Sequence, residues 1–600
     1  MSHTHTVPAW LLLGVLIVRP QVSGVAYPFS QGFLLFPILI GLSLVFLNPG
    51  YRERAAVRTT RLCFTLPLLL LLWSTVTLLW APDPGQGARD CFSLLLNLVI
   101  FTLACHVALD VEDIGKKTGV LLALTAVPVL IRALYQRVFG LSRIRDVLES
   151  MAASGEDISQ LAGVISADRV FAGFLNSNML AGFCAVIIPV TLDLALTSSG
   201  ELRRNALYSL LGAEIVVLIL TGSLGGSAAA GIMATAVVGV RRGFRRNVLV
   251  SAFALAAVVG GFILGMRGLD FIVGPESSVI QRAGYMAAGV RMAAVSLFAG
   301  WGAGSSPGAL MGFVAEGFRP VADPHNFLIR SWISWGVPGL AIVLLWVLCW
   351  VRSVAAPVRE IGWRSCPEGY AGFVFGAGAF LLHSLVDMDF FVPEVAAFGW
   401  LAMGAALGSA LALSSGEEGE GSRAPDKKRF MAGGFALVMV LPSLIYLQGE
   451  FTAFRGAGAR QEREYSRAAE LLESASRILP FNGRFILDEG RARLSMGDAG
   501  AAETLFVRAD TLMRVSPYPS WEMGRLAQSR EQWSQSLLHL DVALSRYPTS
   551  PRIRIDQALA YLALGDQARA YHLLTEARRL SMFDPAAGRT AKELLMRLGL

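Results

Sequence analysis

Four polar residues, Asp323-Pro324-His325-Asn326, lie directly before a long apolar segment and contain the side chain best suited to acid–base chemistry. Histidine titrates near neutral pH, so an imidazole at such a boundary can accept a proton from an attacking hydroxyl. The weakly apolar stretch 267–324 before it carries Arg267, Arg282, Arg291 and Arg319. Guanidinium groups remain charged and bind phosphate oxygens in pairs. The combination predicts chemistry on an anionic, phosphate-bearing substrate; the alternative is that His325 only caps the helix that follows.

A second polar group is expected at the outer entrance of another apolar segment. Arg169 is followed by Gly173-Phe-Leu-Asn-Ser-Asn178. Charged and amide side chains are costly against lipid, so Arg169 and Asn178 are predicted to line a cavity that binds substrate. Arg282 and Arg291 are nine residues apart, which places them on nearly opposite faces of one helix. For each arginine alone, the competing interpretation is contact with lipid headgroups.

A third group, His383, Asp387 and Asp389, falls at the end of a predicted helix. The spacing of four places His383 and Asp387 on one helical face, with Asp389 at the outer end of the helix. Asp387-Met-Asp389 has the form of an Asp-x-Asp metal motif, but two carboxylates are few ligands for Mg²⁺ or Mn²⁺. We therefore expect Asp387 to line the substrate cavity and expect no metal or other cofactor.

The composition identifies the class of protein that must position these residues. The 600 residues are 54% hydrophobic and 16% charged, and their mean hydropathy is +0.53. About 20 apolar residues are needed to cross a bilayer core, and about thirteen such segments precede residue 450. They are expected at 8–24, 31–47, 64–80, 91–109, 118–136, 172–196, 206–221, 225–240, 247–266, 331–351, 370–387, 393–413 and 430–447.

Positive charge alternates along these segments. Arginine and lysine cluster after every second helix, in the loops near residues 52–61, 116–117, 203–204, 241–246, 352–364 and 423–429. The positive-inside rule places those loops and the N-terminus in the cytoplasm. The loops 137–171 and 267–330, and everything after residue 447, then face outward. These clusters also account for the net charge of +7, so no nucleic-acid partner is predicted.

The character of the sequence changes after residue 450, where apolar runs are shorter and apolar positions recur at helical spacing. Leu494-Ser-Met-Gly497-Asp498 returns 68 residues later as Leu562-Ala-Leu-Gly565-Asp566. This spacing is twice 34, and the segment 460–600 resembles about three to four tetratricopeptide repeats, which are helix pairs stacked into a solenoid. We expect a separate domain outside the membrane that offers a docking surface to a protein partner. The alternative is an assembly appendage with no specific ligand.

Several short motifs together resemble one family, the O-antigen ligase/polymerase superfamily. They are Arg169 with Gly173–Asn178, Leu220-Thr-Gly-Ser223, Arg282, Gly300-Trp-Gly-Ala-Gly304, His325-Asn326 and Gly336-x-x-Gly339. The resemblance covers about residues 165–410 and rests on the order and spacing of these motifs. It implies a membrane bundle like that of glycosyltransferase-C enzymes. The predicted fold class is thus all-α, with a polytopic bundle over 1–450 followed by an α-solenoid over 460–600.

The resemblance also implies an activity in the bacterial inner membrane. The donor would be a glycan linked to undecaprenyl pyrophosphate at the periplasmic face, and the acceptor lipid A core, another glycan or a protein hydroxyl. By position, Arg282 would contact the pyrophosphate and His325 would orient or deprotonate the acceptor. Arg169 would help to line the cavity, and Asn326 would fix the histidine or the helix start.

One position departs from the family pattern. The family usually has an arginine after the serine of the Leu-Thr-x-Ser motif, and this chain has Leu224 there. Either another arginine supplies that charge, or the donor is held differently. Two other functions stay open on this basis: a transporter or flippase for a lipid-linked sugar, and a catalytically inactive scaffold for polysaccharide export.

Overall fold

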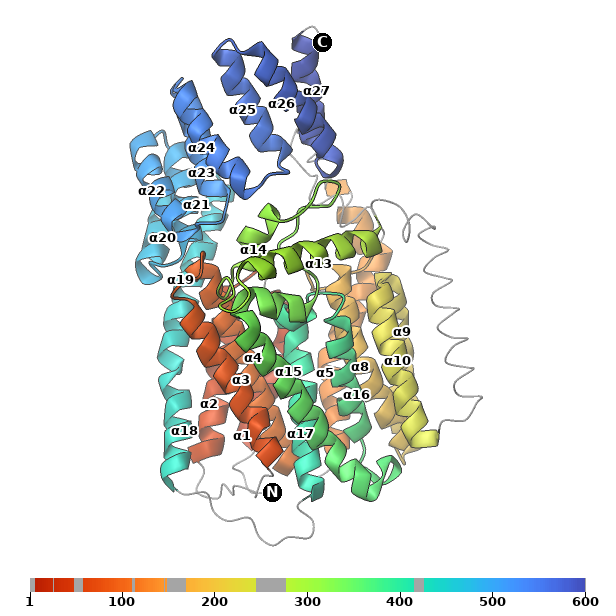
Figure 1. The fold of residues 1–600 in the computed structure, drawn as a ribbon. Coiled ribbons are helices and arrows are strands. Elements are labelled where there is room, and N and C mark those ends of the chain that lie inside the picture. Colours follow the sequence, from red (N-terminus) through yellow and green to blue (C-terminus); the bar gives the residue numbers. More distant parts are fainter. Residues whose placement is uncertain are drawn as a thin grey trace.

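The chain folds into an upright helical bundle with a stack of shorter helices over one end, as Figure 1 shows. The computed structural model describes residues 6–24, 26–47, 58–110, 114–144, 146–147, 169–243, 277–414 and 426–598. Every regular element in these ranges is helical, which confirms the all-α class.

Ten helices among the described residues are long and apolar enough to cross a membrane, judged by length and composition alone. The bundle contains α1 (Thr6–Val18), α2 (Phe29–Leu47), α3 (Arg58–Thr77), α4 (Pro84–Asp110), α5 (Ile114–Tyr135), α8 (Ser177–Thr197), α9 (Glu201–Thr221), α10 (Leu224–Arg242), α15 (Phe327–Ile361), α16 (Tyr370–His383), α17 (Pro393–Ser414), α18 (Asp426–Val438) and α19 (Val440–Gln461). Of the thirteen predicted ranges, 247–266 lies outside the described residues. Each of the others overlaps a helix.

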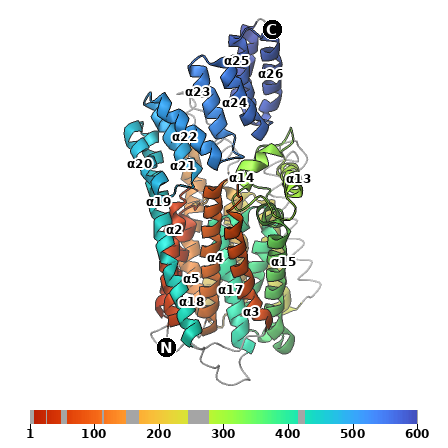
Figure 2. The ribbon, with the colours of Figure 1, turned by 60° about the vertical axis from the view of Figure 1, so that its left-hand side comes forward.

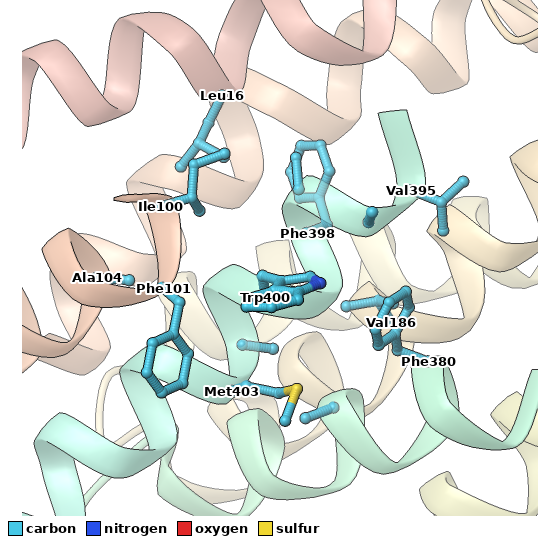
Figure 3. Close-up of a cluster of buried hydrophobic side chains, with 14 of the residues drawn as sticks. Leu16, Ile100, Phe101, Ala104, Val186, Phe380, Val395, Phe398, Trp400 and Met403 are labelled. Atoms are coloured by element: carbon cyan, nitrogen blue, oxygen red, sulfur yellow. The ribbon is translucent and has the colours of Figure 1, made fainter. Parts of the chain in front are cut away.

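Small residues let the central helices α4 and α17 approach closely. A β-carbon on Gly404 would lie 2.2 Å from the carbonyl oxygen of Phe101, and one on Gly408 would lie 2.1 Å from that of Cys105. Such close backbone contact is the usual packing mode of apolar helices in membranes. Trp400 and the Phe101 ring fill the space beside this contact (Figure 3). The result is a rigid, apolar centre below the polar outer end.

Two helix ends differ from the sequence prediction, and both differences shape the site. Helix α16 ends at His383, so Asp387 lies beyond it in a turn, and the expectation of His383 and Asp387 on one helical face is wrong. Helix α15 begins at Phe327, four residues earlier than predicted, and breaks at Gly336, where φ is 64°. A positive φ is open to glycine at little cost.

The solenoid is built from one turn repeated four times. Residues Arg463, Glu531, Gly497 and Gly565 all have positive φ, and successive turns are 34 residues apart. The residue after each donates its N–H to the carbonyl oxygen five positions earlier, at 2.8–3.0 Å, as in a Schellman motif. Asp498 and Asp566 then cap the next helix through their side chains. The predicted period of 34 is therefore confirmed.

These turns join antiparallel helix pairs and lead to a final helix. The helices are α19 with α20 (Tyr465–Ile478), α21 (Gly483–Ser495) with α22 (Ala499–Leu512), α23 (Tyr518–Ser529) with α24 (Trp533–Arg546), α25 (Pro551–Ala563) with α26 (Gln567–Leu580), and α27 (Pro585–Arg597). Residues 450–460 were predicted to separate the bundle from the solenoid, but helix α19 runs through them without a break. The bundle and the solenoid therefore share a helix.

The solenoid also rests on the loops at one end of the bundle (Figure 2). The Arg514 guanidinium donates to the carbonyls of Trp80 and Ala81, between α3 and α4, at 3.1 and 2.8 Å. The Arg579 guanidinium pairs with Glu316 at 2.5 Å, farther along the same side. The repeats are thus fixed over the end of the bundle that carries the predicted site.

Candidate functional site

The start of α15 is tied to the turn after α16. The Asn326 side chain accepts from the N–H groups of Leu328 and Ile329 at 3.0 and 3.1 Å, which caps the helix. Its amide group donates to the carbonyl of Leu385 at 2.9 Å. Asn326 thus fixes the helix start and joins it to the loop that contains Asp387.

His325 is held in a left-handed backbone conformation with φ of 56°, which costs an L-residue about 1 kcal/mol. Its N–H donates to the Asp323 carboxylate at 2.7 Å, and its ring Nδ1 lies 2.8 Å from the Asp323 carbonyl oxygen. A carbonyl only accepts, so Nδ1 carries a proton, and in the neutral ring Nε2 is the nitrogen with the lone pair. The half-buried ring packs on Tyr285 with centroids 5.3 Å apart. The imidazole is therefore presented as a base through Nε2.

A buried ion-pair network holds Asp323 in place. Arg330 donates to Asp323 at 2.5 Å and to Asp90 at 3.1 Å, and its guanidinium lies 4.0 Å from the centre of the Phe391 ring. Both carboxylate oxygens of Asp323 are then engaged, one by Arg330 and one by the His325 N–H. The sequence prediction missed this network. Its one signal was that Asp90 and Arg330 are charges placed directly before predicted apolar segments.

Arg282 and Asp387 form the second element of the site. They pair at 2.6 Å, and their side chains are 16% and 1% exposed, so the arginine reaches the surface while the carboxylate stays beneath it. Burial raises the pKa of Asp387, but the positive charge of Arg282, helped by the two nearby histidines when they are protonated, lowers it more, and the pKa falls below its ordinary value. The carboxylate is therefore ionised and orients the guanidinium.

His383 pairs with Asp389, not with Asp387, and lies under the site. Its Nδ1 is 2.5 Å from an Asp389 oxygen, and both side chains are fully buried. Glycines make room for the pair: a β-carbon on Gly182 would be 2.1 Å from Asp389, and one on Gly225 would be 3.3 Å from His383 Nε2. The described residues contain no group of three histidine, cysteine or acidic side chains arranged to hold a metal.

Arg169 and Asn178 meet at the turn between α9 and α10. The Arg169 guanidinium donates to the Thr221 carbonyl at 2.5 Å and to the Asn178 side chain at 2.6 Å. The turn passes through Gly222, where φ is 62°, and a β-carbon there would lie 3.5 Å from Arg169 Nε. Leu224, the residue at the departing position, is the first residue of α10. A guanidinium thus occupies this turn, although it comes from residue 169.

The two groups lie at the same end of the bundle. Gly225, at the start of α10, packs on His383 and Val386, so the turn beside Arg169 touches the turn that leads to Asp387. Arg291 is not part of this assembly. It is exposed on the other side of α13 (Ser278–Val295), where it donates to the Phe313 carbonyl at 2.8 Å. The predicted substrate-binding role of Arg291 therefore has no geometric support.

No protein-family model matches the chain, and no curated protein matches it. Among solved structures, the MamA protein is 18% identical, with 26% of this chain and 87% of that chain covered and a TM-score of 0.22. The Cut9–Hcn1 hetero-tetramer of APC/C is 11% identical, covering 85% and 77%, with a TM-score of 0.22. Yeast Tom70 is 13% identical, covering 66% and 88%, with a TM-score of 0.21. TM-scores this low do not show a shared fold. The assignment of the repeat architecture therefore rests on the four turns described above.

Proposed function

We propose that the chain is a bacterial inner-membrane glycosyltransferase that moves a glycan from undecaprenyl pyrophosphate to an acceptor hydroxyl. The resemblance to the O-antigen ligase/polymerase superfamily supplies the substrate class. The observation that carries the proposal is the contact of His325 Nδ1 with the Asp323 carbonyl oxygen, which leaves Nε2 of the neutral ring as the proton acceptor. Arg282, which pairs with Asp387 and reaches the surface, adds a group suited to phosphate.

The proposed topology follows from charge and apolar length. Ten helices are long and apolar enough to span, and the basic loops follow every second predicted helix, so those loops and the N-terminus are assigned to the cytoplasm. The opposite end, which carries His325 and the solenoid, is then periplasmic (Figure 1). This arrangement gives the candidate site access to lipid-linked donors in the outer leaflet.

The proposed reaction is a single displacement with inversion. The acceptor oxygen attacks the anomeric carbon and gives its proton to His325 Nε2. The bond between that carbon and the pyrophosphate oxygen breaks, and its electron pair leaves with undecaprenyl pyrophosphate. Arg282 stabilises the charge that develops on the leaving group, which is the usual largest contribution of such a site. Arg169 supplies a positive charge at the turn where Leu224 replaces the arginine that the family usually has. The site therefore keeps a guanidinium at this turn.

The test is transfer by purified protein in nanodiscs, mixed with undecaprenyl-pyrophosphate oligosaccharide and each acceptor in turn: lipid A core, a second lipid-linked glycan and a peptide. Product is followed by gel and mass spectrometry. His325→Ala and Arg282→Ala should each abolish transfer, and Arg291→Ala, on the same helix as Arg282, should not. The productive acceptor distinguishes a ligase from a polymerase or a protein glycosyltransferase. Folded protein that binds donor but transfers to no acceptor would instead support a flippase or an inactive scaffold.

A further inference from the structure

Helix α13, which carries Arg282, lies crosswise over the outer end of the upright helices (Figure 1). One side of it is packed. Ala288 and Met292 are fully buried in a cluster with Ile333 of α15, and a β-carbon on Gly289 would lie 2.7 Å from Ile329. The helix is thus fixed to the start of α15 by one face only.

The opposite side of α13 is apolar and exposed. Large hydrophobic side chains that are 37–70% exposed lie on this side, Val279, Ile280 and Val290, and at the end of the helix and directly after it, Val295, Leu297 and Phe298. Exposed Ala283, Ala287 and Ala294 fill the positions between them. A surface of this kind on a helix is expected to be covered by something apolar. We call these nine residues the α13 apolar face.

The α13 apolar face continues into the outward face of α15. The carbonyl of Leu297 accepts from the Trp332 indole at 3.2 Å and from the Val337 N–H at 3.1 Å. Beyond them on α15, Val337, Leu344, Leu345 and Leu348 are exposed as well. In Figure 2, α13 lies above α15 on the same side of the molecule. The two helices therefore present one continuous apolar surface.

The length of α15 indicates the depth at which α13 lies relative to the bilayer. After its break at Gly336, α15 continues for 25 residues to Ile361, and about 20 residues are enough to cross a bilayer core of about 30 Å. Its first turns, with Trp332, then lie at the membrane–water boundary, where tryptophan is enriched. Helix α13 packs on these same turns and so lies at that boundary.

Two arginines border the α13 apolar face. Arg282 and Arg291 are nine residues apart, which at about 100° per residue is about two and a half turns, so the two side chains leave the helix in opposite directions. Val290 lies between their two directions. An apolar helix face with arginine at its edges is typical of helices that lie in the plane of a membrane surface, with the guanidinium groups at the level of the phosphates.

We propose that the α13 apolar face lies in the outer leaflet of the bilayer, at the boundary between headgroups and acyl chains. The inference rests on the proposed function, and it names how the site meets its lipid-linked donor. Arg282 is held at the depth of lipid phosphates, where the pyrophosphate of a carrier dissolved in the same leaflet arrives.

The first test measures lipid contact directly. All six cysteines are buried, so a bimane label can be directed to Ala287→Cys in the full chain in nanodiscs that contain brominated lipid. Leu345→Cys on α15 and Ser545→Cys on the solenoid are the controls. Quenching at residue 287 close to that at 345, and none at 545, is expected. A label at 287 quenched no more than at 545, while 345 is quenched, would overturn the inference. So would a label at 287 protected from both bromolipid and aqueous iodide, because a protein then covers the face.

The controls separate this inference from the proposed function. If the label at Leu345→Cys were unquenched, membrane insertion itself would fail. A second variant, Ala287→Glu, addresses the donor: it should raise KM for full-length undecaprenyl donor roughly fivefold and leave KM for a short-chain, water-soluble donor unchanged. Ala287→Leu should alter neither value. An equal rise for both donors would contradict lipid contact, because the charge would then act on the site and not on access from the leaflet.

Discussion

The candidate site of the bundle and the turns of the solenoid both use the left-handed backbone conformation, but for different purposes. In the solenoid, the left-handed position is filled by Gly497 and Gly565 in two turns and by Arg463 and Glu531 in the others. The side chain there is interchangeable, so the turn needs only the conformation. In the bundle, His325 also has this conformation, and both its backbone N–H and its ring nitrogen contact Asp323. The left-handed conformation thus accepts different side chains in the solenoid, whereas in the bundle it holds one particular side chain, His325, in place.

Their ion pairs differ in the same way. The solenoid pair Arg530–Glu503 has side chains 33% and 44% exposed, whereas the bundle pair Arg330–Asp323 has 9% and 6%. Exposed pairs contribute about 0–1 kcal/mol and are readily replaced. A buried pair is costly to break, because the partner left behind has no water. The Arg330–Asp323 pair therefore fixes geometry, whereas the exposed Arg530–Glu503 pair contributes little.

The largest expected effect comes from removing a buried charge. Arg330→Met leaves Asp323 and Asp90 without their guanidinium and should destabilise the protein by about 3–5 kcal/mol, with transfer reduced as His325 loses its support. Arg530→Met in the solenoid should cost less than about 1 kcal/mol. Thermal unfolding of both variants in detergent checks this. Equal effects at the two positions would remove the distinction between the regions.

A smaller effect should appear in the acid dependence of stability. The folded pKa of Asp387 lies below its ordinary value. The stability that its charge contributes is therefore present above about pH 4, the unfolded value, and is lost as pH falls through the lower folded value. Asp387→Asn should cost about 1.5–3 kcal/mol at neutral pH and flatten this acid loss. Unfolding measured from pH 7 to pH 3 gives the comparison, and an unchanged acid slope in the variant would refute the pairing with Arg282.

The smallest effect concerns the solenoid turns. Glu531→Gly relieves a left-handed residue and should stabilise the solenoid by about 1 kcal/mol, less the entropy that glycine adds to the unfolded chain. Gly497→Ala should destabilise it by a similar amount. Neither should change transfer. Thermal unfolding with a parallel transfer assay is the measurement. Altered transfer in either variant would show that the turns do more than join the helices of the solenoid.

Much of the fold could be predicted because its signals are local. Apolar runs located the helices, and Gly497-Asp498 with Gly565-Asp566 revealed the period. The turns at Arg463 and Glu531 were invisible, since neither residue marks a left-handed conformation. The end of α16 was placed too late because Leu385 and Val386 keep the sequence apolar after the helix has stopped.

The site was predictable only where its residues are neighbours in sequence. His325 and Asn326 precede an apolar segment and were identified from that position. The pairing of Arg282 with Asp387 joins residues 105 apart, and Arg330 reaches Asp90 across 240 residues. Such contacts depend on how helices pack, which no local pattern records.

The proposed role of His325 as a base is tested most directly by the initial rate of glycan transfer by His325→Gly. Glycine accepts a φ of 56° without strain, so this variant should fold as the parent does and bind donor with unchanged affinity. Transfer should fall by about 10²–10⁴-fold, the usual contribution of a general base. A rate within a few-fold of the parent, on folded protein that binds donor, would contradict the claim.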